Sequence, residues 1–506
     1  MMKRILLLTV LSLAYLGSAA QGLYVATDKS CYLAGEEIGC SAFCAPGPAV
    51  AYLELVSSEG SAAAVKLALQ DGRGAGTLRI PFDTPTGNYR LAAWLPGMEP
   101  DSGSGPIISV FNTFTTARVR NGVVITDKPA AAPVPVQTGY GISADTVRDS
   151  VIISNLSGQD VSLCISLFRE DSLQGETRGP ISSFNFSGPG ERSFGETLSG
   201  CLSGPGAPAS GSVILAVPGS KTDCYQVMPD DEGRFSVQTE NIFGDVDLVC
   251  IPPIGSKDCH VEVDSPFRCP AATGLPQLEL SRSMEGDLLR RSAALRTKLA
   301  TDTLAMTLPM RRDHFFLEKE CTSYILDDYT RFPTMEEVFV EIIPFAKMRH
   351  RNGKTKIYVL INGAVMDSAP RWGEAMVMVD GVPVPDGSLI ESYDPSLVKT
   401  LDVYPYKYNL GGTEFDGVIN LVTFKGNMPG LLFDDNVRIY GFHGCSYPVA
   451  FEGSETLFWH PLVSLPAGGR IAIPCSGASE GSCCTLRVEG LNAGGRAVYF
   501  RKTFVR

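Results

Sequence analysis

The sequence contains few of the residue patterns that build catalytic and metal sites. It has five histidines in 506 residues, and none stands in an HExxH or zinc-finger spacing. Its fourteen cysteines include no CxxC pair, which argues against a thiol-redox or zinc-cluster role. No P-loop pattern is present either. We therefore expect a protein that is not an enzyme and has no cofactor, and we assign no catalytic, ligand-binding or metal-ligating residue.

Adjacent aspartates occur at three places in the chain, at positions 230–231, 327–328 and 434–435. Each pair lies beside a predicted turn, where carboxylates are usually solvated and do not act as an acid/base pair. The alternative is an enzyme whose site assembles from loops without a recognisable motif.

The chain is acidic and has little uninterrupted apolar sequence. Its 43 Lys and Arg against 55 Asp and Glu give a formal net charge of −12. This balance opposes nucleic-acid binding, because nucleic-acid-binding proteins usually carry a basic patch. Beyond residue 20, no stretch approaches the roughly 18 consecutive apolar residues of a membrane-spanning helix. We expect no nucleic-acid partner and no transmembrane span in the mature chain.

Residues 1–20 have the order of a secretory signal peptide. A basic pair at positions 3–4 precedes an apolar run at 5–16, and small residues at 17–20 supply a cleavage site. No cysteine stands at the cleavage point, which disfavours a lipoprotein. We expect an exported protein that is periplasmic or associated with the outer membrane.

The cysteine count leaves two interpretations open. An even number of cysteines in an exported protein suggests disulfides, whose connectivity the sequence does not give. However, Cys40 and Cys44 share one face of a predicted strand, where a cysteine also serves as a small buried hydrophobic residue.

Composition and periodicity favour a multidomain, mainly β protein. The chain has 52 glycines and 34 prolines and only one or two convincing helices, which is typical of short strands joined by turns. In the first mature segment, apolar runs recur at intervals of about 10–14 residues, as in antiparallel sandwiches. The runs are Leu23–Ala26, Ile38–Phe43, Ala51–Val56, Ala63–Leu69, Thr77–Ile80, Tyr89–Trp94 and Ile107–Phe114.

This first segment resembles the macroglobulin-type sandwich that precedes the bait region in α-2-macroglobulins. The T-D-K-x-x-Y-x-x-G-E pattern of that family is present almost whole, and a P-T-G-N-Y run follows at 85–89. The resemblance implies structural roles for Thr27, Asp28, Lys29, Tyr32, Gly35, Glu36, Gly87 and Tyr89. It also raises a protease-trap function, but no cysteine stands in the Cys-Gly-Glu-Gln type motif that trapping members use for their thioester. We therefore expect no trapping activity.

A second distinctive segment spans residues 331–429. An amphipathic stretch that opens at Pro333 and a strand at Lys356–Ile361 precede three short apolar runs, which predict three further strands. The order resembles the plug domain of TonB-dependent outer-membrane receptors, with its V-x-D-G-V-P turn, aspartate-proline helix start and G-V-I-N-x-x-T-x-K strand. The resemblance implies structural roles for Asp380, Gly381, Pro383, Asp394, Pro395, Gly417, Asn420 and Thr423.

The barrel that normally follows a plug has no room here. After Lys425 only 81 residues remain (506 minus 425), and glycine-rich turns separate their short apolar runs. We therefore expect a plug-like domain without a barrel.

The remaining sequence is assigned by composition. Residues 283–304 predict one amphipathic helix or a pair, which we expect to pack on the plug-like domain, with a membrane-surface helix as the alternative. We place Trp459 in a core and not in a ligand site. The expected order is a signal peptide (1–20), a macroglobulin-type β-sandwich (23–118), a Pro/Ala linker (119–136), a second macroglobulin-like β segment (137–196), a small prealbumin-like, carboxypeptidase-regulatory-like β-sandwich (197–265), a helical connector (266–330), the plug-like domain (331–429) and a C-terminal β-sandwich (430–506).

Two classes of function fit these observations. The first is a non-catalytic, exported binding or scaffolding protein of the cell envelope, whose loops and strand edges engage an envelope protein partner. The alternative is an accessory component of an outer-membrane uptake system that binds a barrel protein or a small ligand.

Overall fold

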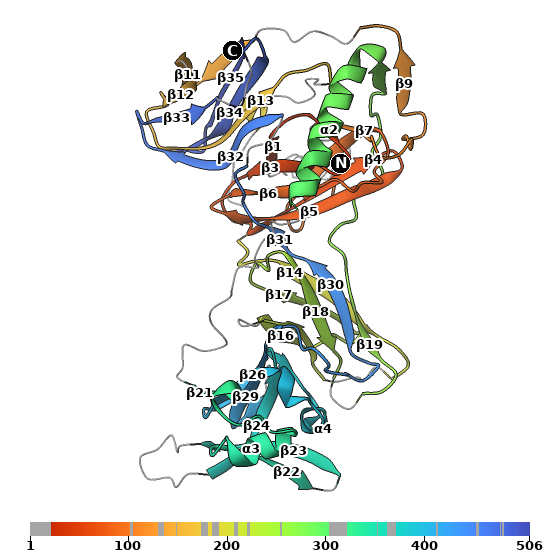
Figure 1. The fold of residues 1–506 in the computed structure, drawn as a ribbon, viewed down its shortest axis with the longest axis vertical. Helices are drawn as coiled ribbons and strands as arrows, with labels where there is room; N and C mark the ends of the chain where they lie inside the picture. The colour runs from red at the N-terminus through yellow and green to blue at the C-terminus, as the bar shows by residue number, and fades with distance from the viewer. Residues whose placement is uncertain are drawn as a thin grey trace, which may run out of the picture. The chain divides into compact units, whose positions relative to one another are not determined.

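The structure is a computed structural model that describes residues 22–101, 105–129, 136–147, 149–173, 181–184, 192–206, 211–219, 223–253, 256–302, 321–351, 353–361, 371–410, 413–451, 455–475, 477 and 480–506. The described chain is mainly β, which confirms the predicted fold class. It divides into two compact units (Figure 1). Unit 1 comprises Met1–Gly195, Pro266–Met306 and Cys445–Arg506, and unit 2 comprises Glu196–Ser265 and Thr307–Gly444. The predicted signal peptide at 1–20 and residues 130–135 of the predicted linker lie outside the described residues.

The first part of unit 1 is a nine-stranded sheet of order β1-β3-β6-β5-β4-β7-β8-β2, with β31 paired to β5. Alternate side chains of these strands turn inward, so that Ile38, Leu53 and Leu67 are fully buried in one cluster. All seven predicted runs are confirmed as strands. The strands are β1 (Tyr24–Thr27), β2 (Cys31–Leu33), β3 (Glu37–Phe43), β4 (Val50–Ser57), β5 (Gly60–Gln70), β6 (Arg73–Arg79), β7 (Gly87–Trp94), β8 (Ile107–Phe111) and β31 (Cys445–Ser446).

The second part of unit 1 combines two distant stretches of the chain. A five-stranded sheet of order β10-β35-β34-β13-β32 faces a three-stranded sheet of order β11-β12-β33 around a shared core. The strands are β10 (Gln137–Tyr140), β11 (Ile142–Val147), β12 (Ser150–Asn155), β13 (Val161–Arg169), β32 (Thr456–Leu465), β33 (Arg470–Pro474), β34 (Cys483–Asn492) and β35 (Ala497–Val505).

This arrangement differs from the expectation that 137–196 and 430–506 are separate domains. Strand β13 is buried along nearly its whole length and pairs with β32 on one side and β34 on the other. A central strand of this kind has no partners within its own segment, so the C-terminal strands complete its sheet. The C-terminal segment is also divided, because residues up to Gly444 belong to unit 2.

Helix α2 (Glu285–Asp302) is the longest described helix and belongs to unit 1. Its Leu295 packs with Cys31, Leu33 and Phe111 of the first sheet. The expectation that this helix packs on the plug-like domain is therefore wrong, because its apolar stripe matches the end of the macroglobulin-type sheet. The elements beside it are a parallel pair, β9 (Val123–Thr126) and β20 (Leu278–Ser281), and the short 3-10 turn η2 (Arg282–Met284). A second 3-10 turn, η1 (Ile181–Ser183), packs with Tyr24 and Trp459.

Unit 2 begins with a small two-sheet sandwich. A sheet of order β17-β14-β19 faces a sheet of order β16-β15-β18-β30, and Val213, Leu215 and Leu248 fill the space between them. The strands are β14 (Thr197–Ser203), β15 (Val213–Val217), β16 (Asp223–Val227), β17 (Arg234–Gln238), β18 (Asp245–Ile251), β19 (His260–Val263) and β30 (Arg438–His443).

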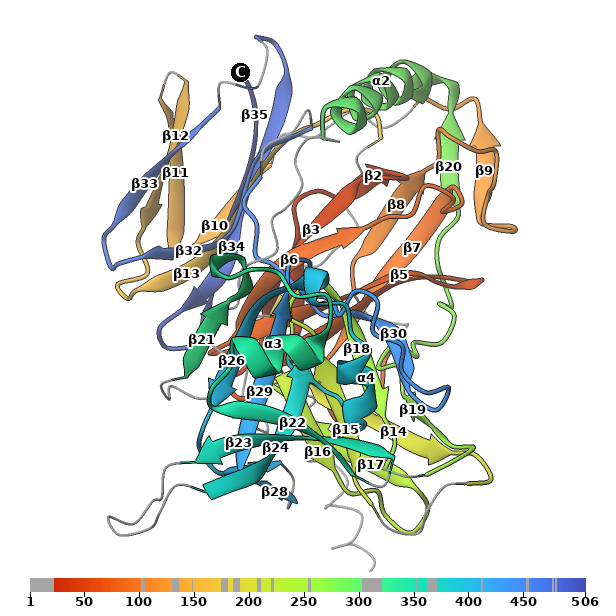
Figure 2. The ribbon, with the colours of Figure 1, turned by 60° about the horizontal axis from the view of Figure 1, so that its bottom comes forward.

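The rest of unit 2 is an α/β layer. Its seven-stranded sheet has the order β21-β26-β29-β24-β23-β22, with β25 beside β24, and α3 and α4 cover one face of it (Figure 2). The elements are β21 (Thr322–Ile325), η3 (Leu326–Asp328), α3 (Met335–Glu341), β22 (Ala346–Arg351), β23 (Lys354–Ile361), β24 (Arg371–Val379), β25 (Val382–Pro383), α4 (Gly387–Glu391), η4 (Pro395–Leu397), β26 (Val398–Tyr404), β27 (Tyr408–Leu410), β28 (Thr413–Phe415) and β29 (Gly417–Thr423).

No disulfide joins any of the fourteen cysteines, all of which lie in described residues. The second interpretation of the cysteines therefore holds for Cys40 and Cys44, which are both buried in the first core. Burial raises the pKa of the Cys44 thiol to about 11. None of the helices in the described ranges is long and apolar enough to cross a membrane.

Candidate functional site

The macroglobulin-type motif residues converge on a buried cluster in unit 1. Asp28, which is fully buried, follows β1 and accepts hydrogen bonds from the Tyr32 hydroxyl at 2.6 Å and the Gly39 amide at 2.8 Å. Its second carboxylate oxygen accepts from Thr456, 2.5 Å away in the other sandwich of the same unit. A single carboxylate thus ties the turn after β1 to its own sheet and to a strand more than 400 residues later in the chain.

Lys29 extends this cluster as a buried cation. Its ammonium lies 3.2 Å from Glu36 and 3.5 Å from Asp28, and 4.1 Å from the centre of the Tyr32 ring. Burial lowers the pKa of Lys29, but the attraction of Glu36 and Asp28 outweighs burial and raises the pKa overall. The ion pairs therefore keep Lys29 charged at neutral pH although it is withdrawn from water.

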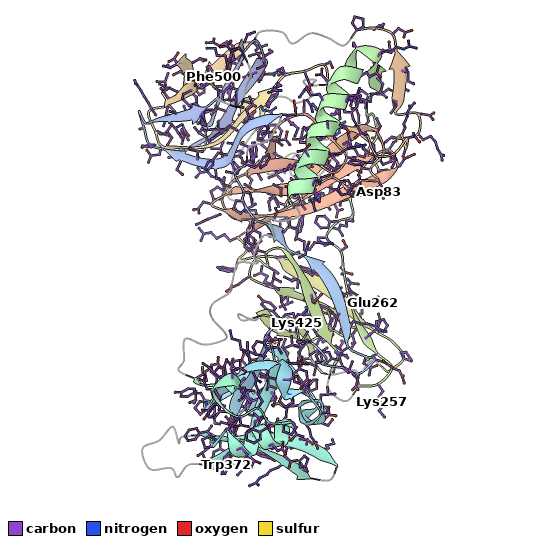
Figure 3. The ribbon with its side chains drawn as sticks, viewed as in Figure 1. Asp83, Lys257, Glu262, Trp372, Lys425 and Phe500 are labelled. Atoms are coloured by element: carbon purple, nitrogen blue, oxygen red, sulfur yellow. The ribbon has the colours of Figure 1, made fainter. Side chains whose placement is uncertain are left out.

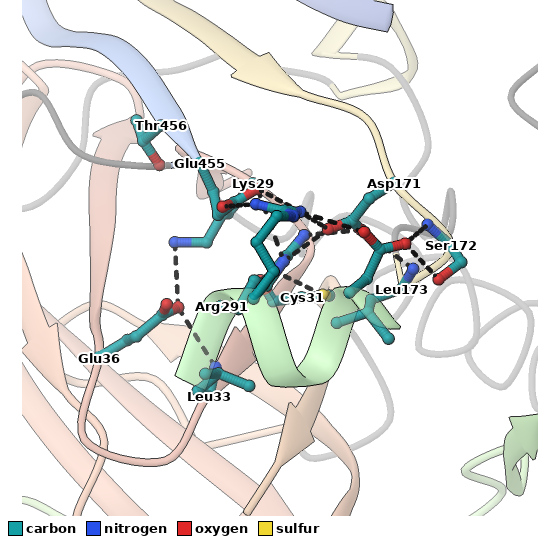
Figure 4. A network of polar contacts seen from close by, with 12 residues as sticks. Lys29, Cys31, Leu33, Glu36, Asp171, Ser172, Leu173, Arg291, Glu455 and Thr456 are labelled. Carbon is teal, nitrogen blue, oxygen red and sulfur yellow. Dashed lines mark hydrogen bonds and ion pairs between the residues drawn. The ribbon is translucent and has the colours of Figure 1, made fainter. Parts of the chain in front are cut away.

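Helix α2 adds two arginines to the same cluster (Figure 4). Arg291, 1% exposed, reaches Asp171 with two nitrogens at 2.7 and 2.8 Å, in the bidentate geometry that guanidinium and carboxylate favour. Arg290 reaches the same carboxylate at 2.9 Å and also pairs with Glu455. Asp171 follows β13 and Glu455 precedes β32, so the helix is bound to the second sandwich through buried charges.

Asp287 completes the cluster, and Cys31 lies beside it. Burial raises the pKa of Asp287, but hydrogen bonds from the Ser172 hydroxyl and amide, together with Arg290, outweigh burial and lower the pKa overall. Cys31 lies 3.2 Å from an Arg291 nitrogen, and burial raises the pKa of its thiol to about 12. A thiol with so high a pKa is protonated at neutral pH and is a poor nucleophile.

We call these residues the ionic cluster: Asp28, Lys29, Tyr32, Glu36, Asp171, Asp287, Arg290, Arg291 and Glu455. Its charged groups pair with one another, which is the condition under which buried charges are tolerated. These ion pairs join the first sheet, the second sandwich and α2 of unit 1.

Sequence reasoning found only one side of this cluster. The motif contributes Asp28, Lys29, Tyr32 and Glu36, whereas residues 283–304 predict only an amphipathic helix or a pair, with no partner for its arginines. Their partners in the second sandwich carried no signal at all, because ion pairs between distant segments leave no local pattern.

The other macroglobulin-motif residues shape the surrounding backbone. Gly35 has a φ of 91°, and a Cβ there would lie 2.5 Å from the Phe82 ring, so the turn requires glycine. Thr27 donates a hydrogen bond to the Lys29 carbonyl at 2.8 Å. A Cβ on Gly87 would lie 2.6 Å from Val119, and the neighbouring Tyr89 donates to the Pro85 carbonyl at 2.7 Å.

The plug-motif residues form a second buried cluster, in unit 2. Asp380 is 1% exposed and accepts hydrogen bonds from the Thr423 amide and hydroxyl and from the Met428 amide, at 2.6 to 2.8 Å. Asn420 accepts from the Gly381 amide at 2.9 Å. Asp380 and Gly381 have φ values of 47° and 80° between the paired strands β24 and β25, as in a type I′ hairpin turn.

The remaining plug-motif residues lie at element ends. Asp394 caps η4 through the Ser396 amide, with Pro395 at the first position of that turn. Pro383 ends β25, opposite Met378, and Gly417 begins β29. The structure thus brings Asp380, Gly381, Asn420 and Thr423 together and leaves the others in separate turns.

His314 lies outside the described residues, the other four histidines form no metal-type group, and Trp459 lies in a core. His260 contacts Glu262 and His443 contacts Asp245 on the surface of unit 2. Trp459 is 1% exposed and packs with Tyr24 and Phe43. Within the described ranges, no three His, Cys, Asp or Glu side chains are grouped so that they could hold a metal ion.

Comparison with known proteins gives only remote similarities. No protein-family model matches the chain, and no curated protein matches it. Among solved structures it is similar to native Escherichia coli α-2-macroglobulin, at 10% identity and a TM-score of 0.17, over 96% of this chain and 22% of that one. Salmonella α-2-macroglobulin reacted with methylamine gives 10% identity, a TM-score of 0.17, and coverage of 96% and 23%.

A tetra-tandem repeat from the extending region of a large adhesion protein is also similar, at 9% identity and a TM-score of 0.14, over 96% of this chain and 99% of that one. The chain spans less than a quarter of the length of the two macroglobulins. At these TM-scores, none of the similarities carries an argument about function. None of the comparisons supports the resemblance to a TonB-dependent receptor plug.

Proposed function

We propose that this is an exported, non-catalytic binding or scaffolding protein of the cell envelope that engages a protein partner. The observation that supports the proposal most strongly is the ionic cluster. Its charged residues pair with one another and join the layers of unit 1. Export is supported by the order of residues 1–20, which is typical of a signal peptide.

Strand edges of unit 2 are the surfaces that such a protein would offer. The seven-stranded sheet ends in β21 on one side and β22 on the other. An exposed edge can accept a strand from another chain, with affinity from backbone hydrogen bonds and specificity from alternate side chains. The small sandwich of unit 2 packs on the same core as this sheet and would hold these edges on a rigid support.

Crosslinking in intact envelopes tests this proposal. Cells expressing the tagged chain would be fractionated, treated with a short-range crosslinker and purified under denaturing conditions. We expect the chain in the envelope fraction, crosslinked to one or a few specific proteins. A chain that stays cytoplasmic, or that yields no partner above an untagged control, would contradict the proposal.

The second candidate is an accessory component of an outer-membrane uptake system. It is supported by the plug-like order of residues 331–429 and by the Asp380-Gly381 turn, which the structure fixes through Thr423 and Asn420. In this case a barrel protein should co-purify in mild detergent. A monodisperse soluble monomer in envelope extracts would count against it.

A further inference from the structure

Strand β22 ends the seven-stranded sheet of unit 2, and among the described residues no strand pairs with its outer side. The Leu360 amide donates to the Phe345 carbonyl at 2.8 Å, which fixes the alternation of the antiparallel β22–β23 pair. Lys347 and Arg349 therefore direct their backbone groups toward β23, and Met348 and His350 direct theirs outward. The outer edge thus offers two amides and two carbonyls to a further strand.

The open sheet face beside this edge is basic, although the chain as a whole carries a net charge of −12. Lys347 and Arg349 on β22 share this face with Lys356 on β23, and exposed Lys354 begins β23. Lys356 is paired with Glu374 at 2.7 Å. Among the described residues, no carboxylate lies within ion-pair distance of Lys347, Arg349 or Lys354. Burial and the repulsion of Arg349 lower the pKa of Lys347, so the positive charges on this face destabilise one another.

Aromatic rings hold these cations in place. The Lys347 ammonium lies 3.4 Å from the centre of the Trp372 ring, and the Arg349 guanidinium lies 5.7 Å from the Tyr358 ring centre. Trp372, labelled in Figure 3, is 37% exposed. Charged residues on an edge strand often serve only to prevent aggregation. That role needs no ordered cations, whereas stacking on rings fixes their positions before a partner arrives.

We propose that β22 accepts an antiparallel strand from a protein partner that carries acidic side chains at every second position. This inference rests on the proposed function and names the surface and the partner's chemistry. In such a pairing, the acidic residues stand opposite Lys347 and Arg349, in the closely spaced positions of an antiparallel ladder. The residues between them exchange backbone hydrogen bonds with Met348 and His350. The positive charges of Lys347 and Arg349 therefore favour binding of an acidic strand over a neutral or basic one.

A synthetic octapeptide of alternating Glu and Thr, with blocked ends, serves as the probe for calorimetric titration of the full chain. We expect saturable binding that weakens as salt rises, because exposed charge attraction is screened. The double variant Lys347→Glu, Arg349→Glu should bind at least about tenfold more weakly, since two like charges then face each other across the ladder. The matched control, Lys399→Glu with Lys425→Glu, makes the same charge change elsewhere in unit 2 and should bind like the parent (Figure 3 labels Lys425).

Methylated peptides separate strand addition from simple charge attraction. If the threonines pair with Met348 and His350, N-methylation of the threonines should abolish binding. N-methylation of the glutamates should leave binding intact, because those amides face away from β22. Equal binding by both methylated peptides, or loss only with methylated glutamates, would overturn the proposal.

Two further outcomes distinguish the sources of failure. Binding of the chain to vesicles of anionic phospholipid, with no binding of the peptide, would show a lipid-binding face and overturn strand addition. A specific crosslinked partner in envelopes that is retained by the Lys347→Glu, Arg349→Glu variant would leave the proposed function intact and reject β22 as the docking edge.

Discussion

Replacing Arg291 by methionine tests whether the ionic cluster holds unit 1 together. The guanidinium is almost fully buried and bonds Asp171 with two nitrogens, so its removal leaves a buried carboxylate that has lost its best partner. Breaking a buried ion pair on one side costs about 3–5 kcal/mol. Arg290 still lies 2.9 Å from Asp171, which places the expected loss near the lower end. For a unit of about 300 residues, about 3 kcal/mol corresponds to a fall in Tm of roughly 5 °C.

The three tryptophans provide a selective assay for this variant. Trp94 and Trp459 are buried in unit 1, and Trp372 lies in unit 2. In a Trp372→Phe background, tryptophan fluorescence during urea unfolding therefore reports unit 1 alone, which avoids fitting a multidomain transition as one step. The midpoint should shift to lower urea with the slope unchanged.

Two variants control this experiment. Arg296→Met removes an exposed arginine from the same helix, and it should change stability by less than about 0.5 kcal/mol. The double variant Arg291→Met, Asp171→Asn should lose at least about 1 kcal/mol less than the sum of the single variants, because the remaining partner is no longer charged. A loss below about 1 kcal/mol for Arg291→Met, or strict additivity in the double variant, would refute the role that we assign to the cluster.

Three further predictions follow from other buried groups. Asp380→Ala should destabilise unit 2 by about 3 kcal/mol or more, because three buried donors lose their acceptor and alanine is strained at positive φ. Asp380→Asn should lose clearly less unfolding free energy. Equal losses for the two variants in chemical denaturation would argue against this account. The lowered pKa of Asp287 means that its contribution to stability is present above its unfolded pKa of about 3.9 and is lost as pH falls through the folded value. The stability difference between the parent and Asp287→Asn should therefore shrink below about pH 4, and a difference that stays constant down to pH 2 would contradict the assignment. With a thiol reagent under native conditions, exposed Cys321 should react first and buried Cys31 only on unfolding; fewer than fourteen reactive thiols in denaturant without reductant would show disulfides that the structure lacks.

Much of the fold could be predicted because its signals are local. Apolar β-branched runs such as Ala51–Val56 and Val418–Val422 lie within β4 and β29, and α2 lies within the amphipathic stretch predicted at 283–304. Strand β10, with sequence QTGY and every side chain exposed, escaped prediction. It exists because β35 offers it a partner, and its own composition carries no strand signal.

The candidate site could be predicted only in part, for the same reason. The motif around Asp28 and Lys29 lies in one short stretch, so its turn chemistry is visible in the sequence. Its partnership with Asp171 and Arg291 spans the chain, and ion pairs require only proximity, which no periodicity records. The basic face of β22 was likewise invisible, because Lys347 and Trp372 are neighbours only once β23 lies between them.

The sequence by itself determined the mainly β class, most strands, the capped turns and the glycines at positive φ, since these depend on each residue's own conformational preferences and on short-range hydrogen bonds. The tertiary structure alone decided that β13 lies between two C-terminal strands, that α2 packs in unit 1, and that the charges of three segments meet in one buried cluster. Each strand and each charged side chain has many compatible partners in the chain. The pairing that forms depends on which combination buries the apolar faces while leaving no charge without a counter-charge.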